Sequence, residues 1–162
     1  MPVINMSYHS SQRQFDPQAL IAMGPQIRVD VLPPSIVQKW AKNQNINVPT
    51  APNQAALLDT GASVTGIDED LLKKLNYPPI GTANLSSPSG SSQTLVYVVM
   101  LVIPSRSAHN FPTNIPRIRI DNVRAVSVKL TNKPYKILLG RDIISKMVMI
   151  YNGPQAVITL GY

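Results

Sequence analysis

The stretch that decides the fold is Leu57-Leu58-Asp59-Thr60-Gly61-Ala62-Ser63, where an apolar run ends abruptly in a turn. The run before the acid, residues 55–58, is typical of a buried strand. A carboxylate beside such a run is costly to bury unless it is paired or hydrogen-bonded, so Asp59 needs a reason to be there. A plain turn, in which the Asp side chain accepts backbone N–H bonds, would be one such reason. Taken alone, the turn is compatible with a structural or a chemical role.

A second motif lies far downstream, where Ile137-Leu138-Leu139-Gly140-Arg141-Asp142 precedes a short stretch with helical spacing. We expect Asp142 to cap that helix. Together the two motifs resemble those of the retroviral-type aspartic proteases, the retropepsins. In that family a hydrophobic-hydrophobic-Asp-Thr-Gly turn carries the catalytic carboxylate, and a hydrophobic-hydrophobic-Gly-Arg-Asp/Asn segment packs behind it. The resemblance extends from about Ala55 to Tyr162, and a hairpin expected over residues 147–160 makes the chain more similar to cellular and bacterial members than to the shortest viral enzymes.

The resemblance implies an all-β fold, namely the retropepsin-like acid protease β-barrel with short helices and one half-site per chain. Aspartic proteolysis uses two carboxylates that share one proton. The chain has a single Asp-Thr-Gly, and its other acids sit in no similar context. The resemblance therefore implies a homodimer in which Asp59 of both subunits meets on a two-fold axis, with a polypeptide substrate and no cofactor.

The family's roles transfer to the turn residue by residue. Asp59 would be the acid and base, and Thr60 would hydrogen-bond across the dimer to hold the two turns rigid. The Gly61 carbonyl would accept a substrate N–H. Ala62 and Ser63 would line the substrate cleft.

A polar hairpin tip over residues 86–93 lies between two apolar stretches. The resemblance identifies it as the flap that closes over the substrate and excludes water, with Ser89 and Gly90 as its candidate contact residues.

The chain departs from many viral members at Ser63. An Asp commonly occupies that position there and pairs with the Arg that matches Arg141. Since Ser63 cannot form that ion pair, the partner of Arg141 stays open at this point, and a purely structural role at the start of a helix is an equally good interpretation.

Composition favours the same class of fold. The chain has 162 residues, of which 44% are hydrophobic and 14% charged, enough for one domain with a packed core. Its 15 Pro and 8 Gly disfavour long helices and favour short strands joined by turns. We expect a flexible N-terminal arm over residues 1–23, which show no clear period, and a retropepsin-like aspartic protease domain over residues 24–162.

Local patterns predict the elements of that domain. Alternating polar and apolar residues over 26–32 predict a strand with one buried face. Residues 35–41 have helical spacing, with Trp40 expected in the core, and residues 68–75, with acids first and lysines last, predict another short helix. Residues 117–120 and 123–130 predict two separate strands. Asn152-Gly153 predicts a hairpin near the C-terminus.

The residues available for chemistry exclude several other mechanisms. The chain has no Cys, and His9 and His109 are its only imidazoles, so a zinc site and a Ser-His-Asp triad are not expected and we predict no metal. No run of about 18 apolar residues is present, so neither a signal peptide nor a membrane span is expected. We accordingly expect no membrane partner and a cytoplasmic location.

The formal net charge is +7, and the whole basic excess lies C-terminal of Ile103. A basic nucleic-acid-associated β-domain is therefore one alternative. However, basic residues that alternate with Ile and Val on a strand usually form its solvated face, so nucleic acid is not expected as a partner. A second alternative is a catalytically silent retropepsin-fold dimer that acts as a binding or scaffolding module, against which the intact Asp59 argues. The favoured prediction is an aspartic endopeptidase that hydrolyses peptide bonds with a water activated between two Asp59 carboxylates.

Overall fold

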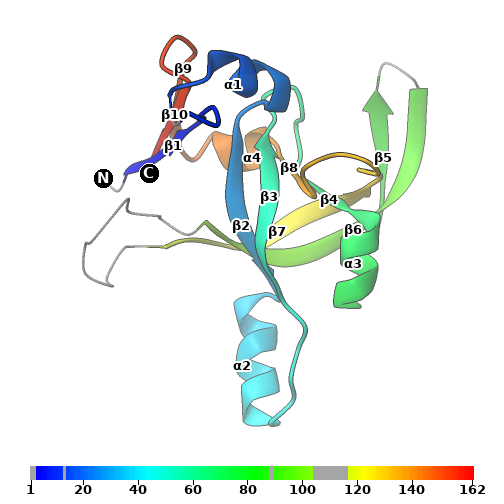
Figure 1. Ribbon diagram of the computed structural model, residues 1–162. Helices are drawn as coiled ribbons and strands as arrows, with labels where there is room; N and C mark the ends of the chain where they lie inside the picture. The colour runs from blue at the N-terminus through cyan, green and yellow to red at the C-terminus, as the bar shows by residue number, and fades with distance from the viewer. Residues whose placement is uncertain (1–2, 13, 88–89, 104–116) are drawn as a thin grey trace.

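Strands dominate the architecture and form two sheets (Figure 1). The computed structural model describes residues 3–12, 14–87, 90–103 and 117–162. A seven-stranded sheet has the order β2-β3-β8-β4-β7-β6-β5, and β2 also pairs with β6. Because this extra pairing joins the sheet to itself, six of the strands form a closed barrel and β5 extends beyond it. The predicted all-β barrel with short helices is confirmed.

The strands of this sheet run over β2 Gln26–Leu32, β3 Ala51–Leu58, β4 Gly66–Asp68, β5 Gly81–Ser87, β6 Gly90–Ile103, β7 Ile118–Val128 and β8 Ile137–Leu139. A separate three-stranded sheet has the order β1-β10-β9, with β1 Val3–Ser7, β9 Val148–Asn152 and β10 Val157–Gly161. Four short helices connect them: α1 Pro17–Met23, α2 Ser35–Asn43, α3 Glu69–Leu75 and α4 Arg141–Ile144.

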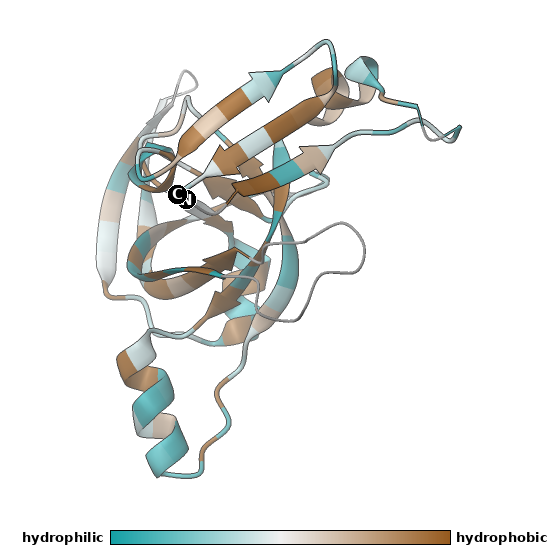
Figure 2. Cartoon of the chain, turned by 90° about the vertical axis from the view of Figure 1, so that its left-hand side faces the viewer, coloured by the Kyte–Doolittle hydropathy of each residue, from teal (hydrophilic) through white to brown (hydrophobic). Residues whose placement is uncertain are grey.

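The barrel interior is filled by one face of each strand. On β2, Val29 and Val31 are fully buried, whereas Arg28, which precedes Val29, is exposed. This is the predicted alternation of buried and exposed side chains along one strand. The brown segments of Figure 2 accordingly lie mainly on the strands. Apolar burial of this kind is the main favourable contribution to folding.

Most local predictions agree with the structure. The strand at residues 26–32, a hairpin formed by β5 and β6 and the C-terminal hairpin are present at the expected places. In α3, Lys73 forms ion pairs with Glu69 and Asp70, one turn away, as the charge order of this helix predicts.

One prediction about strand number is wrong. Residues 117–120 and 123–130 were expected as two strands, but β7 runs continuously from Ile118 to Val128. Asn122 adopts a positive φ of 55°, and the register of β7 against β6 shifts between Val99 and Leu101. The interruption of the alternating pattern is therefore a local irregularity within a single strand.

The N-terminal segment differs from the arm without regular structure expected for residues 1–23. Its strand β1 pairs antiparallel with β10, and its helix α1 is capped by Asp16, whose side chain accepts a hydrogen bond from Ala19 N at 3.0 Å. Ile4 and Leu20 are buried in the core. The strand β1 has only five residues, and its partner lies at the other end of the chain, so the local sequence pattern does not predict it.

Tyr8 connects this N-terminal segment to the barrel. Its hydroxyl donates to the Gly24 carbonyl at 2.8 Å and accepts from Gln26 N at 2.6 Å, immediately at the start of β2. Burial raises the pKa of Tyr8. Since the phenol bonds both Gly24, just after α1, and Gln26, the first residue of β2, it holds the end of α1 beside the start of the barrel.

Helix α2 is present as predicted, but the position expected for its Trp is wrong. Trp40 is 55% exposed, and Ala41 is the buried residue of this helix. Figures 1 and 2 show α2 extending away from the barrel, at the end opposite the β5–β6 hairpin. Helical spacing identified the helix correctly, but it could not reveal that, among the described residues, no other element covers Ile36 and Trp40.

We predict that the N-terminal segment contributes to stability through Leu20. Leu20→Ala should lower the free energy of unfolding by roughly 2–5 kcal/mol, since a fully buried leucine is truncated. The neighbouring Ile21→Ala is the matched control, because Ile21 is 69% exposed, and it should change that free energy by less than about 0.5 kcal/mol. Urea unfolding of both variants provides the measurement. Equal effects of the two substitutions would show that α1 does not pack as described.

Candidate active site

The Asp59 turn begins where β3 leaves the sheet. β3 runs parallel to β8, with Leu57 opposite Leu138 and Leu58 opposite Leu139. The backbone N–H of Asp59 donates to the Leu139 carbonyl at 2.9 Å and so continues this pairing by one residue. The backbone of Asp59 is therefore held by the sheet, while its half-buried side chain belongs to the turn.

The two oxygens of the Asp59 carboxylate have different environments. Oδ1 accepts hydrogen bonds from Gly61 N at 2.9 Å and from Ala62 N at 3.3 Å. No hydrogen bond or ion pair to Oδ2 is seen from any residue in the described ranges. The backbone thus fixes the orientation of the carboxylate and leaves one oxygen without a partner within this chain.

The absence of a side chain at Gly61 serves this arrangement. A Cβ there would lie 3.1 Å from Asp59 Oδ1, a tight contact beside the oxygen that accepts the two N–H bonds. Gly61 therefore allows the close approach of backbone and carboxylate.

The segment 139–142 holds the rest of the turn from behind. Arg141 N donates to the Ala62 carbonyl at 2.9 Å, and Asp142 N donates to the Ser63 carbonyl at 3.3 Å. These two backbone bonds join parts of the chain that lie about 80 residues apart in sequence. The Arg141 side chain also bonds the turn, to residues 81 and 80 positions earlier in the chain. The two sequence motifs are therefore in direct contact.

The Arg141 side chain forms hydrogen bonds to carbonyl groups of the turn, where the matching Arg of many viral members pairs with a carboxylate. Its Nη1 donates to the Thr60 carbonyl at 2.7 Å, with a longer contact of 3.4 Å to the Gly61 carbonyl. Hydrogen bonds from a charged donor are stronger than neutral ones, so this side chain adds a further constraint on the turn. A carbonyl oxygen has two lone pairs, so the Gly61 carbonyl remains able to accept a substrate N–H.

Thr65 is a site residue that the sequence analysis missed. Its side chain is fully buried, and its hydroxyl donates to Asp142 Oδ1 at 2.9 Å and accepts from Gly140 N at 3.3 Å. The expected capping role of Asp142 is wrong, because Gly140 occupies the N-cap position of α4 and no side-chain cap bond forms. The only available signal was a hydroxyl within the apolar run 64–67.

Gly140 is required by close packing between the two motifs. A Cβ at this position would lie 2.5 Å from the Val64 carbonyl carbon and 2.6 Å from its oxygen. Because these are backbone atoms, they cannot move aside as a flexible side chain can. The backbone of α4 can therefore approach the active-site turn only with glycine here.

The candidate flap lies at the same end of the molecule as this turn. In Figure 1 the β5–β6 hairpin extends at the upper right, and the upper end of β3 lies between it and the three-stranded sheet. Ser87 pairs with Gly90, which is exposed and adopts a φ of 125°, a conformation that suits glycine. Ser89 lies outside the described residues. Of the cleft residues expected, Ala62 is half-buried and Ser63 is exposed.

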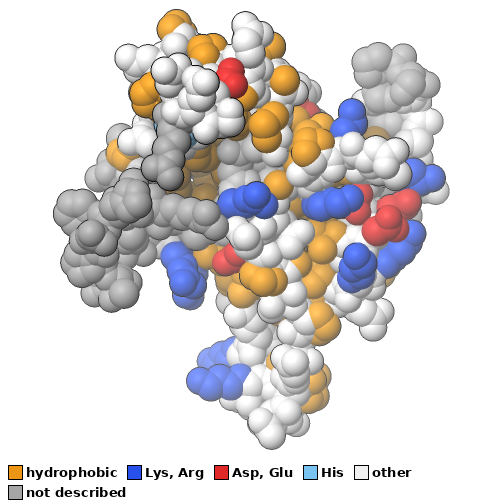
Figure 3. Space-filling model, viewed as in Figure 1, with side chains coloured by type: hydrophobic (Ala, Val, Ile, Leu, Met, Phe, Trp, Pro, Cys, Tyr) orange, Lys and Arg blue, Asp and Glu red, His pale blue; other side chains and the backbone are white. Residues whose placement is uncertain are grey.

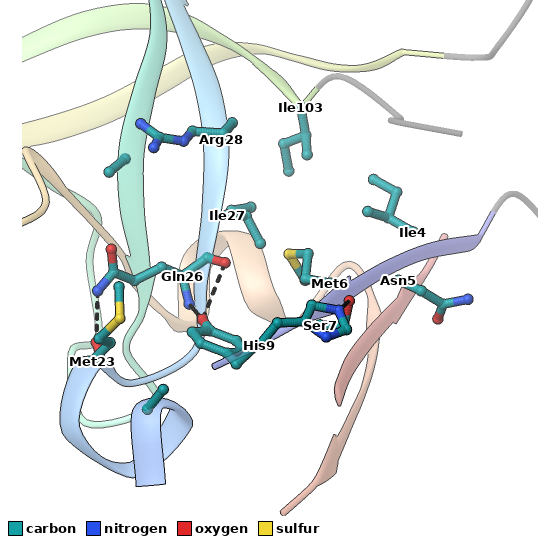
Figure 4. A pocket seen from close by; sticks show the side chains of 13 residues that line it. Ile4, Asn5, Met6, Ser7, His9, Met23, Gln26, Ile27, Arg28 and Ile103 are labelled. Carbon is teal, nitrogen blue, oxygen red and sulfur yellow. Dashed lines mark hydrogen bonds between the residues drawn. The ribbon is translucent and has the colours of Figure 1, made fainter. Parts of the chain in front are cut away.

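A cavity of about 490 Å³ lies elsewhere, between β1, α1 and the β2–β3 pair (Figure 4). Ile4, Met6, Ile27 and Ile103 are among its lining residues, and Figure 4 shows these side chains around a common space. No residue of the Asp59 turn lines it. This cavity is therefore not the substrate cleft that the sequence analysis expects at Asp59.

Two further observations concern the described residues alone. They contain no group of three or more His, Cys, Asp or Glu side chains that could hold a metal ion. Among their helices, none is long and apolar enough to cross a membrane.

Comparison with known proteins is consistent with this geometry. The sequence profile of a family described as aspartyl protease matches residues 53–143, more than half of the chain and both motifs of the site. A search of curated proteins finds no significant match.

Among solved structures, the chain is similar to a retropepsin-like aspartic protease from Rickettsia conorii, with 12% identity and a TM-score of 0.52 over 99% of this chain and 92% of that one. The simian foamy virus (mac) protease is 16% identical, with a TM-score of 0.42 over 75% of this chain and 92% of the other. The foamy viral protease-reverse transcriptase in complex with an RNA/DNA hybrid is 16% identical, with a TM-score of 0.44 over 77% of this chain and 13% of the other. At these identities, the likeness to the Rickettsia structure shows the fold.

We predict that the Thr65 hydroxyl stabilises the contact between the two motifs. Thr65→Val should lower the free energy of unfolding by about 1–3 kcal/mol, because the Asp142 carboxylate loses a donor and the Gly140 N–H loses its acceptor in a buried position. Thr65→Ser keeps the hydroxyl and should have a smaller effect. Chemical denaturation of the two variants measures the difference. If serine destabilised the protein as much as valine does, the methyl group of Thr65 would be what matters, and the hydroxyl bridge would not.

Proposed function

Because the chain belongs to the aspartyl protease family, we propose that it is an aspartic endopeptidase in which Asp59 from each subunit of a homodimer activates a water molecule for attack on a peptide bond. Its barrel is retropepsin-like, as the resemblance of the two motifs predicted. The observation that carries the proposal is the Asp59 carboxylate, with Oδ1 oriented by two backbone N–H groups and Oδ2 without a partner in the described chain.

The chemistry requires a second carboxylate. One ionised group takes a proton from the attacking water, and a protonated group donates a hydrogen bond to the substrate carbonyl. The sequence contains one Asp-Thr-Gly, so a single chain supplies half of this pair. A two-fold axis beside the turn would bring the Oδ2 atoms of two Asp59 residues together and complete the site. The reaction itself uses only water and the two carboxylates, so no cofactor enters the proposal.

The remaining residues of the turn have supporting roles in this proposal. Thr60, which is exposed, would hydrogen-bond across the dimer, and the Gly61 carbonyl would bind a substrate N–H. Ala62 and Ser63 would contact the substrate beside the cleavage point. The β5–β6 hairpin would close over an extended polypeptide and exclude water from the site, with Ser89 and Gly90 as its candidate contact residues.

An apolar strip on the outer face of the three-stranded sheet supports a second copy of the chain as the partner. Val148 lies opposite Gly161, which lies opposite Val3, so Val3 and Val148 are on one face together with Ile150. These three side chains are between 47% and 55% exposed. Large exposed apolar groups on one sheet face mark a candidate interaction surface, and the incomplete site indicates which molecule would cover it.

The alternatives have less support. Arg119 and Arg124 are exposed on β7, while Ile118, Ile120 and Ala125 on the same strand are buried. This is the pattern of a solvated strand face, so the basic residues do not by themselves favour nucleic-acid binding. A catalytically silent dimer would not need the Asp59 carboxylate held in a defined orientation, which disfavours the scaffolding interpretation.

We predict that Asp59→Asn abolishes proteolysis and leaves the protein folded. The amide cannot accept the proton of the attacking water, so turnover of a peptide library at weakly acidic pH should fall below about a hundredth of the wild-type value. Asp70→Asn is the matched control, because Asp70 is an exposed acid on α3, and its activity should be unchanged. Substantial residual turnover in the Asp59 variant would assign the catalytic role to another group.

We also predict that the active species contains two chains. Activity per subunit should fall on dilution below the dissociation constant of the dimer. Mixing wild-type chains with an equal amount of Asp59→Asn chains should lower the activity per wild-type chain by about half, because random pairing places half of them with an inactive partner. An equal amount of an unrelated protein is the control. Activity that is insensitive to both treatments, with a monomer seen in sedimentation, would contradict the half-site.

A further inference from the structure

Helix α2 is set apart from the catalytic end of the molecule. Figure 1 shows it below the barrel, whereas the end of β3 and the β5–β6 hairpin lie above. At its base, the backbone N and the hydroxyl of Ser35 both donate to the Asp121 carboxylate on β7. Gln38 Nε2 donates to the Pro33 carbonyl at 2.6 Å, and Ala41 is buried. The helix is thus anchored at its start and along one side, while the other side faces no element of the described chain.

The free side of α2 carries large apolar groups. Ile36 is 69% exposed and Trp40, one helical turn later, is 55% exposed. Ile46, just after the helix, is 49% exposed. Since residues four apart lie on the same face of a helix, Ile36 and Trp40 form one continuous apolar surface. Two side chains of this size would be expected in the core if the folded chain itself could cover them.

The charged side chains of α2 itself are all basic, and the acid at its base, Asp121, is bonded to Ser35. Lys39 and Lys42 are both exposed on α2. Residues 31–58 contain no Asp or Glu, and the whole chain has a net charge of +7. Figure 3 shows blue and orange side chains, and no red ones, on the lobe at the lower end of the molecule. The surface therefore combines apolar side chains with two lysines that form no ion pair within the described residues.

We propose that α2 is a peripheral docking element for an anionic lipid surface, into which Ile36 and Trp40 insert while Lys39 and Lys42 contact the headgroups. A bilayer interface accepts Trp, aliphatic and Lys side chains in this arrangement, and the two lysines complement the charge of anionic headgroups. The charge excludes attraction to a cationic surface. Two apolar side chains give weak, reversible attachment and no membrane span. The expectation of no membrane partner rested on the lack of a long apolar run, which bears on a membrane span and not on attachment to a lipid surface. The structure adds the exposed Trp40.

The chain provides its own probe for this proposal, since Trp40 is its only tryptophan. The full-length protein is titrated with vesicles of phosphatidylcholine alone and with vesicles that also contain phosphatidylglycerol. With the anionic vesicles, the Trp40 emission should shift to shorter wavelength and the protein should sediment with the vesicles, less so at high salt. Binding to phosphatidylcholine alone should be at least about tenfold weaker, because the attraction of the lysines is lost.

Matched variants separate α2 from the rest of the surface. Ile36→Ser should weaken binding about tenfold or more, as expected for one buried aliphatic side chain, whereas Ile21→Ser on α1, whose residue is equally exposed, should not. Lys39→Glu combined with Lys42→Glu should also weaken binding at least tenfold. Lys129→Glu combined with Lys133→Glu makes the same change in net charge away from α2 and should have a smaller effect.

Three results would overturn the proposal. The first is an unchanged Trp40 emission together with no sedimentation on either kind of vesicle. The second is equal weakening by the α2 variants and by their controls, which would assign binding to the overall charge. The third is an emission shift that follows protein concentration without vesicles, which would make a second copy of the chain the occupant of this surface.

Discussion

The contact between the Asp59 turn and the segment 139–142 is the constraint on which the rest of the site depends. β3 and β8 pair in parallel, and the Asp59 N–H extends that pairing into the turn. Beyond this point the turn has no sheet partner. The backbone N–H and the guanidinium of Arg141 instead donate hydrogen bonds to carbonyl groups of the turn. The backbone of the turn is therefore fixed, and its N–H groups restrict rotation of the Asp59 carboxylate. Orientation of this kind, established before the substrate arrives, is what acid–base chemistry requires.

Two small features allow this contact to form. Gly140 permits backbone atoms to approach where any side chain would overlap with Val64, and the Thr65 hydroxyl satisfies polar groups that would otherwise be buried without partners. Unsatisfied buried groups are expensive, so a buried hydroxyl with both a donor and an acceptor partner is worth more than its own hydrogen bonds suggest. Together these features allow the segment 139–142 to pack against the turn that carries Asp59.

The molecule has a clear division between its two ends. At one end lie the Asp59 turn, the hairpin proposed as the flap and the three-stranded sheet proposed to face a second copy of the chain. At the other end α2 presents Ile36 and Trp40 to solvent. A partner that contacts α2 would not cover the turn, so the proposed attachment and the proposed catalysis need not compete. The two exposed apolar surfaces therefore lie at different ends of the molecule, and each is proposed to contact a different partner.

The sequence by itself determined the local elements and the identity of the turn. The alternation over β2, the charge order of α3 and the two hairpins depend on neighbouring residues, and so does the Asp-Thr-Gly that marks the candidate site. Only the tertiary structure decided that β1 pairs with β10, that Asp142 accepts from Thr65 and does not cap its own helix, and that Trp40 is exposed. The physical reason is the same in each case. Thr65 and Asp142 are 77 residues apart, and whether a side chain is buried depends on which distant segments reach it, which no local pattern records.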